Sequence, residues 1–172
     1  MLPEKTAEAF NKLKKIVENP DFKVAADVEI FFEAYTKYIW DYKMVGAIYD
    51  CYCDDIVIKI ENGENLVGIE AEVQGTLTLL NAFPDLRISF IDIFAHKVAE
   101  DEFKFIQITH LDATSLGPSR LGPPTGKKLT YDNMLEMCEC LVKKVNGQWK
   151  IVDEWVSNSN KRVDSVLRGY EF

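Results

Sequence analysis

Residues 122–156 read GPPTGKKLTYDNMLEMCECLVKKVNGQWKIVDEWV, and this stretch decides the fold. It opens with two glycines and two prolines within five residues, a composition that excludes helix and central strand and predicts an ordered loop. An apolar-rich run over residues 134–145 leads into Asn146-Gly147, the pair preferred in the type I′ turn of a β-hairpin. Residues 149–156 are then the return strand. The stretch therefore predicts a loop followed by a closing β-hairpin.

Two acids, Asp153 and Glu154, lie in the middle of this otherwise apolar return strand. A buried carboxylate costs free energy unless it is paired, so one of the two acids is expected to face a cavity. Because side chains alternate along a strand, residues 152, 154 and 156 are expected on one face and residues 151, 153 and 155 on the other. Each face then carries one acid between apolar residues. Alternation alone does not say which acid points inward.

The chain has 172 residues, a length typical of one domain, and the composition of an ordinary globular protein. Its net charge of −8 argues against nucleic acid and against an anionic membrane surface as partners. The first residues lack the apolar core of a signal peptide, and no apolar run approaches the ~18 residues of a membrane span. We therefore expect a cytoplasmic protein without a nucleic-acid or membrane partner.

Helical periodicity dominates the first half of the chain and strand patterns the second. Helices are predicted over residues 3–18, 25–39, 43–52 and 69–82, with a short strand pair at 56–60 and 66–68. Long β-rich runs follow at 86–98 and 103–112, before the hairpin. Helices followed by strands with short connections indicate an α+β fold, an antiparallel sheet with helices on one face. A curved sheet covered in this way leaves a hollow suited to a small ligand.

Several motifs occur in the order and at the spacing of a known family. They are residues 83–87 (FPDLR) at a helix-to-strand junction, the loop 122–127, the Asn146-Gly147 turn, the DEW motif at 153–155, and Trp40 ahead of the third helix. In these motifs, over roughly residues 25–168, the chain resembles the SnoaL-like polyketide cyclases of the NTF2-like superfamily. The resemblance implies an NTF2-like (cystatin-like) cone, a curved antiparallel sheet wrapped around N-terminal helices, with a mostly apolar pocket. Residues 1–22 are then an added N-terminal helix and residues 23–172 the single domain.

The resemblance also implies a catalytic role for Glu154. In the cyclases an aspartate at this place in the last strand is the general acid/base, and an apolar environment raises the pKa of such a carboxyl toward the range in which it exchanges a proton. The position of the cyclases' companion histidine is occupied here by Cys140, which is a departure from the family. A thiol does not replace an imidazole as a polarising group at neutral pH. The alternative for Glu154 is a structural or solvent-facing acid.

His110 is the candidate for a second proton carrier. Asp112 lies on the same strand face, about 6.5–7 Å along the chain, where its charge would favour the imidazolium form. The alternative is a histidine at the surface of the sheet. Arg120, inside the Gly- and Pro-rich loop 114–125, is a candidate partner for an acidic ligand, with a solvated loop residue as the alternative.

Four aromatic residues are candidates for hydrogen-bond donors to a developing enolate: Tyr35, Trp40, Tyr49 and Tyr52. The alternative for each is an aromatic core residue whose polar tip lies at the rim. The four cysteines form two Cys-x-Cys pairs, 51/53 and 138/140. Structural zinc sites usually use Cys-x2–4-Cys, so we expect reduced, buried thiols, no metal and no organic cofactor.

Two functions remain open. The first is a cofactor-free lyase or isomerase that removes a proton beside a carbonyl of a small apolar or polycyclic ligand, giving cyclisation, isomerisation or dehydration. The second is a non-catalytic ligand-binding or dimerisation module of the same fold. A homodimer is expected from the family and from apolar residues on the outer sheet face, namely Leu135, Met137, Leu141 and Trp155, if Glu154 points inward.

Overall fold

The computed structural model describes residues 4–61, 63–130, 134–158 and 160–170. The helices are α1 (Glu4–Val17), α2 (Ala25–Trp40), α3 (Ala47–Cys51), α4 (Ile69–Ala82) and α5 (Asn160–Arg168). The strands are β1 (Val57–Ile60), β2 (Asn65–Val67), β3 (Arg87–Ala99), β4 (Glu102–Thr114), β5 (Lys128–Leu129), β6 (Leu135–Val145) and β7 (Gln148–Asn158). None of the described helices is both long enough and apolar enough to cross a membrane.

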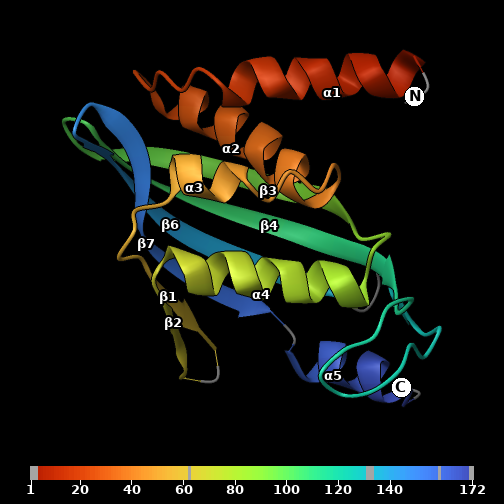
Figure 1. Ribbon diagram of the computed structural model, residues 1–172. Helices are drawn as coiled ribbons and strands as arrows, with labels where there is room; N and C mark the ends of the chain where they lie inside the picture. The colour runs from red at the N-terminus through yellow and green to blue at the C-terminus, as the bar shows by residue number, and fades with distance from the viewer. Residues whose placement is uncertain (1–3, 62, 131–133, 159, 171–172) are drawn as a thin grey trace.

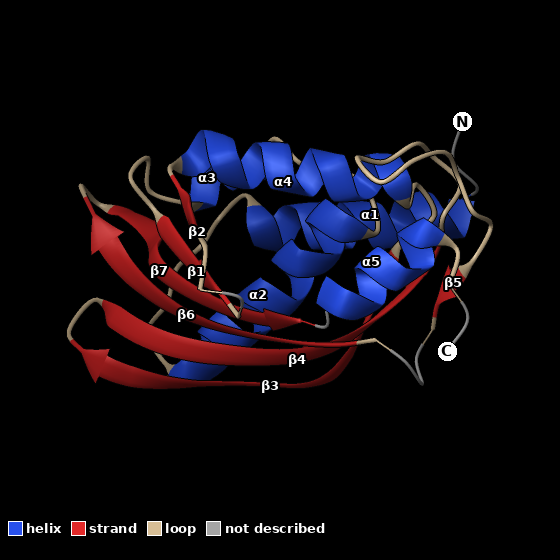
Figure 2. Ribbon diagram, turned by 90° about the horizontal axis from the view of Figure 1, so that it is seen from below, coloured by secondary structure: helices blue, strands red, loops and turns tan. Residues whose placement is uncertain are grey.

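A strongly curved sheet forms one layer, and helices fill its concave side (Figures 1 and 2). The strands follow the order β2-β1-β7-β6-β4-β3, and β5 pairs with the end of β4. Neighbouring strands are antiparallel, as predicted, except that β1 runs parallel to β7. The predicted α+β cone, with its sheet wrapped around helices from the N-terminal half, is confirmed.

The core lies between α2 and the concave face of the sheet. Apolar residues recur along α2 at helical spacing, so one stripe of the helix is buried. Within this stripe the Phe32 ring stacks on Phe105 of β4, with 3.9 Å between ring centroids. The α1 helix covers the outer side of α2, where the Phe10 ring lies 5.4 Å from that of Tyr38 (Figure 1). The third helix is shorter than predicted, because Lys43 adopts a positive φ of 62° that no α-helix accommodates.

The β6–β7 hairpin has the predicted turn and one feature that alternation did not predict. Asn146 and Gly147 both have positive φ, 51° and 82°, as a type I′ turn requires. Further along, Leu141 pairs with Asp153 but Val142 pairs with Ile151, so Val152 is the extra residue of a β-bulge. The bulge restarts the alternation, and Ile151 and Glu154 are both buried. The expectation that Ile151 shares a face with Asp153 was therefore wrong.

A close backbone contact holds the loop after β4 against the end of α4. The amides of Leu116 and Gly117 both donate to the Ala82 carbonyl, at 3.1 Å each. A Cβ at Gly117 would lie only 1.8 Å from the Asn81 carbonyl oxygen, so only glycine allows this approach. The contact places the loop that carries Arg120 beside α4 and α5 (Figure 1).

Candidate active site

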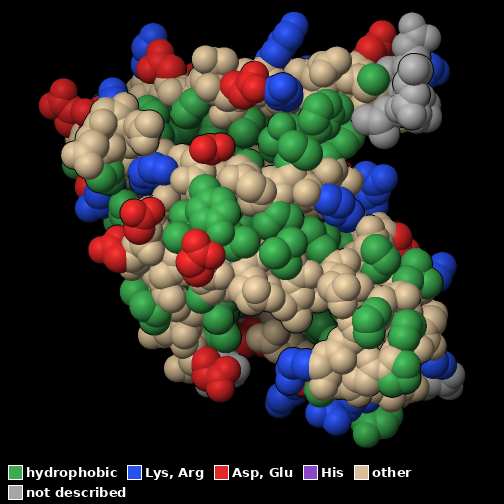
Figure 3. Space-filling view, viewed as in Figure 1, with side chains coloured by type: hydrophobic (Ala, Val, Ile, Leu, Met, Phe, Trp, Pro, Cys, Tyr) green, Lys and Arg blue, Asp and Glu red, His purple; other side chains and the backbone are tan. Residues whose placement is uncertain are grey.

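A cavity of about 590 Å³ lies between the concave face of the sheet and the helices α2, α4 and α5. Its walls are mostly apolar and include Ile39, Ile58, Leu79, Leu111 and Val156. Figure 3 shows the surface hollowed between α4, the β1–β2 strands and α5. The volume falls in the range of small-molecule sites, so the fold provides room for one ligand of modest size.

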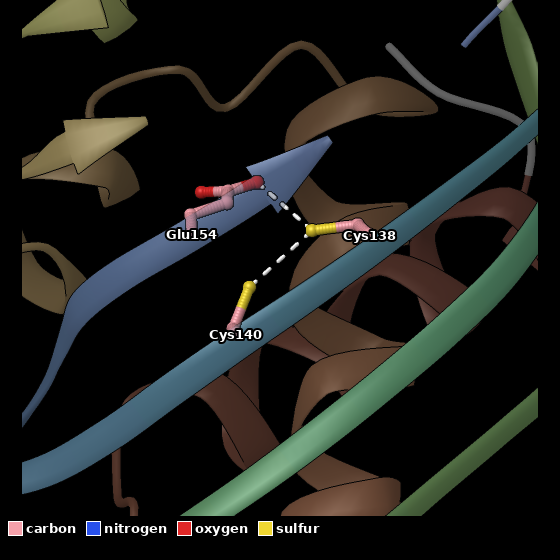
Figure 4. A group of neighbouring side chains, drawn as sticks. All are labelled: Cys138, Cys140 and Glu154. Carbon is pink, nitrogen blue, oxygen red and sulfur yellow. Dashed lines mark hydrogen bonds between the residues drawn. The ribbon is translucent and has the colours of Figure 1, made fainter. Parts of the chain in front are cut away.

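Glu154 reaches this cavity from β7. Its side chain is buried, and Oε1 accepts a hydrogen bond from the Cys138 thiol at 2.9 Å (Figure 4). The second oxygen, Oε2, is buried without a hydrogen-bond partner in the part of the chain that the structure describes. Burial raises the pKa of Glu154, while the Cys138 thiol and the nearby Tyr52 hydroxyl lower it by smaller amounts. The side chain is thus a buried acid at the cavity wall, held through Oε1, with the Tyr52 hydroxyl nearby.

Two further glutamates line the same cavity, Glu72 from α4 and Glu136 from β6. Burial, followed by the charge of Glu154, raises the pKa of Glu72 to about 8, against a hydrogen bond from the Thr76 hydroxyl at 3.2 Å. Burial also raises the pKa of Glu136 to about 7, against a hydrogen bond from the Asn158 amide at 3.3 Å. Three carboxyl groups therefore meet in one apolar space and titrate as a set rather than independently.

Glu72 and Glu136 were not predicted from the sequence, although both carried a signal. Glu72 stands at helical spacing from Thr76 and Leu79 on a face of α4 that lines the cavity. Glu136 shares strand parity with Cys138, on the face of β6 that turns inward. An acid on an otherwise apolar inward face was the same kind of signal that singled out Glu154.

Four of the predicted residues line the cavity as well: Tyr35, Trp40, Tyr52 and Arg120. The Tyr35 hydroxyl donates to the Ala47 carbonyl at 3.2 Å, so it is engaged within the core. Tyr52 is the phenol whose hydroxyl acts on Glu154. Burial raises the pKa of Tyr52 well above the usual range, so it stays protonated and can donate a hydrogen bond. Arg120 is exposed at the rim and pairs with Asp164 of α5 at 2.9 Å.

Four other predicted residues lie elsewhere. Cys140 is not among the described residues that line the cavity, but it pairs directly with Glu154 in the β6–β7 ladder. Tyr49 is 45% exposed and donates to Glu70 at 2.9 Å, on the outside of the molecule. His110 and the exposed Asp112 lie on the same face of β4 as Lys104, which is the face opposite to the buried one.

His110 is thereby separated from Glu154. Its Nδ1 lies 3.1 Å from the Met134 carbonyl oxygen, and the residue is not part of the described cavity lining. Alternation along β4 decides this, because the inward-facing positions on either side are Thr109 and Leu111. The structure does not bring together the two residues expected to exchange protons. Glu72 and Glu136 are the titratable groups that lie beside Glu154 instead.

Comparison with known proteins gives the fold a context. No family model matches the chain, and no curated protein matches it in sequence. Among solved structures, a cystatin-like protein from Caulobacter vibrioides is 14% identical with a TM-score of 0.59, over 82% of this chain and 95% of that one. One assigned as a scytalone dehydratase, from Novosphingobium aromaticivorans, is 14% identical with a TM-score of 0.57, over 78% and 82%.

A third structure, assigned to the SnoaL-like polyketide cyclases, comes from Jannaschia sp. It is 14% identical with a TM-score of 0.55, over 77% of this chain and 88% of that one. These similarities in structure, at low identity, confirm that the chain has the NTF2-like, or cystatin-like, fold that its motifs indicated. Structures with this fold include proteins assigned to different reactions, so the function has to be argued from the cavity.

Proposed function

We propose that the protein is a cofactor-free acid/base enzyme in which Glu154 removes a proton beside a carbonyl of a small, largely apolar ligand. The observation that carries this proposal is Oε2 of Glu154, a buried carboxylate oxygen on the cavity wall without a partner in the described chain. An unsatisfied buried polar group costs about 1–3 kcal/mol. A ligand that presents a donor or an acidic C–H at this position removes that cost.

The neighbouring groups supply the other parts of such a reaction. Glu154 is assigned as the base because the Cys138 thiol donates to it and the Tyr52 hydroxyl lies close, and both stabilise the carboxylate form. Once Glu154 holds the transferred proton, it no longer needs the single O–H of Tyr52, which is then the donor to the enolate oxygen. Glu72, protonated at neutral pH because its pKa is about 8, returns a proton to the ligand or to a leaving group. Isomerisation, cyclisation and dehydration all use this pair of steps.

Hydrogen–deuterium exchange in D₂O tests proton removal before the natural substrate is known. A panel of polycyclic ketones and phenols is incubated with the protein, and deuterium uptake at the carbon beside the carbonyl is followed by NMR. We expect faster exchange than in buffer for the ketones that bind, and a loss of about 10²-fold or more in the Glu154→Gln variant. Undiminished exchange in this variant would remove Glu154 from the mechanism.

Asp153→Asn is the matched control for that variant. Asp153 precedes Glu154, but its carboxylate pairs with Lys59 at 2.7 Å outside the cavity, so exchange should stay near the wild-type rate. The rival function, a non-catalytic ligand-binding module, is favoured by the position of His110 outside the described lining. Tight binding of a ketone without any accelerated exchange would select that rival.

We also propose that the protein is a homodimer that associates through the outer face of the β6–β7 hairpin. Leu135, Met137 and Trp155 are 51%, 43% and 53% exposed there, a concentration of apolar surface that a partner copy would cover. Light scattering on a size-exclusion column should give a dimer mass for the wild type and a monomer mass for Met137→Glu. A wild type that stays monomeric at micromolar concentration would exclude this association.

A further inference from the structure

Cys138, Cys140 and Glu154 gather three potential metal-ligand atoms on the inner side of the hairpin. Their ligand atoms all lie within 4.8 Å of one another, and all three side chains are buried. The Cys138 sulfur is 3.3 Å from that of Cys140 and 2.9 Å from Glu154 Oε1, and Figure 4 shows the three side chains turned toward one another. The described parts of both strands are fully paired here, so the donor atoms are held on rigid backbone.

These separations are close to those found around a single ion. Zinc bonds to cysteine sulfur at about 2.3 Å and to carboxylate oxygen at about 2.0–2.2 Å, which places the ligand atoms of one tetrahedral site roughly 3–4 Å apart. Residues two apart on a strand point to the same side, so the Cys-x-Cys spacing of β6 delivers two thiols to one point. Glu154 enters from the neighbouring strand because it pairs with Cys140.

Two observations beyond the cluster itself favour a cation. Glu154 Oε2 is buried and has no hydrogen-bond partner in the described chain, so the carboxylate retains a free ligand position. The adjoining cavity is lined by the acids Glu72 and Glu136, and the basic side chain within its described lining, Arg120, pairs with Asp164 at the rim. Among the described lining residues, carboxyl groups therefore lie nearest to the place where an ion would bind, and the one basic side chain is already paired at the rim.

We propose that Cys138, Cys140 and Glu154 bind one soft divalent cation of the zinc class. Binding forms two metal–sulfur bonds and one metal–oxygen bond, and each thiol releases its proton to solvent, without oxidation or reduction. Thiolate ligands select zinc, cobalt and cadmium over magnesium and calcium. Cys138 and Glu154 both line the cavity, so the fourth position of the ion faces the space where a ligand binds.

The site has a consequence that goes beyond the proposed reaction. An ion that holds the Glu154 carboxylate keeps it from accepting a proton, so metal binding and proton removal exclude each other. Because two protons leave, the affinity for the metal increases with pH. Metal binding is measured without any substrate, so a failure of this inference leaves the proposed acid/base function untouched, and the reverse also holds.

Cobalt titration tests the site. The full chain is first reduced with a phosphine and freed of metal with a chelator. We expect a sulfur-to-cobalt charge-transfer band that saturates at one equivalent, disappears when one equivalent of zinc is added, and persists in excess magnesium. Cys138→Ser and Cys140→Ser should each reduce the band and weaken cobalt binding. Loss of a residue that only supports a metal ligand costs about 10–100-fold in affinity, and loss of either thiol should cost more. Glu154→Gln should weaken binding while both thiolates still contribute to the band.

Cys53→Ser is the matched control, because Cys53 belongs to the other Cys-x-Cys pair and lies outside the cluster. It should titrate like the wild type. A second measurement needs no variant: prolonged alkylation reaches buried thiols through local opening, and zinc should slow it at Cys138 and Cys140 relative to the metal-free chain, but not at Cys53, as read by peptide mass spectrometry. A wild-type chain without the band at one equivalent, or with unprotected Cys138 and Cys140, would overturn the proposal.

Discussion

The inner and outer faces of the β6–β7 hairpin place two carboxylate side chains in opposite environments. Asp153 and Glu154 are neighbours in sequence, yet Asp153 pairs with Lys59 at the surface, whereas Glu154 is buried beside a thiol. Strand alternation places the two acids on opposite faces. The β-bulge at Val152 decides that Glu154 is the inward one, since it makes Ile151 and Glu154 face the same way. A carboxylate thus acquires its chemistry from strand register rather than from its own identity.

The largest expected difference between the two faces is in stability. Ile151 is 1% exposed on the inner face, so Ile151→Ala should lower the free energy of unfolding by about 2–5 kcal/mol through lost burial and a cavity. Trp155 is 53% exposed on the outer face, and Trp155→Ala should change it by about 0.5 kcal/mol or less in dilute, monomeric protein. Urea unfolding of both variants measures the contrast. Similar losses would mean that both faces are packed.

A smaller difference should appear as a function of pH. Glu72 has an ordinary pKa of 4.5 when unfolded and a folded pKa of about 8, so the folded protein holds its proton more tightly. Stability from this group is present below the unfolded pKa and is lost as the pH rises through the folded one. Between about pH 5 and about pH 9, wild type should therefore lose at least ~1.4 kcal/mol relative to Glu72→Gln, the equivalent of one pKa unit.

Unfolding curves of both proteins at the two pH values measure this loss. Glu70→Gln is the matched control for removing a glutamate from α4, because Glu70 is exposed and contacts Tyr49 rather than the cavity. Glu70→Gln keeps Glu72, so it should lose stability between the two pH values as the wild type does. If Glu70→Gln removed the loss as Glu72→Gln does, the assignment of the effect to the cavity would be contradicted.

The smallest effect belongs to the outer ion pair. Lys59 and Asp153 are 2.7 Å apart, with side chains 41% and 45% exposed, so solvent screens their attraction. A double-mutant cycle with Lys59→Ala and Asp153→Ala should give a coupling energy of about 0.2–1 kcal/mol that decreases in high salt. A salt-independent coupling well above this range would show that the outer face is as dry as the inner one.

The fold could be predicted from local sequence patterns. The Asn146-Gly147 turn, the helical stripe of α2 and the order of helices before strands were sufficient to predict an α+β cone. Each of these signals involves residues that are close in sequence, and their backbone preferences act before the chain is packed. The shortened α3 is the exception, because no local pattern indicated the positive φ at Lys43.

The candidate site could be predicted from the sequence only in part. Glu154, Tyr52, Trp40 and Arg120 were predicted and line the cavity, whereas His110 lies on the wrong parity of β4. Glu72 was missed because α4 is distant in sequence from the hairpin it faces. Its meeting with Glu154 depends on how α4 packs over the sheet, which no local pattern encodes.

The sequence by itself determined the turn, the periodicity of each element and the presence of two acids in the last strand, because these depend on single residues and their immediate neighbours. Only the tertiary structure decided which acid faces inward, since a bulge at Val152 sets the parity of the later residues of β7. It also decided that three glutamates and two thiols share one buried region, because burial and charge proximity arise only when α4, β6 and β7 are packed together.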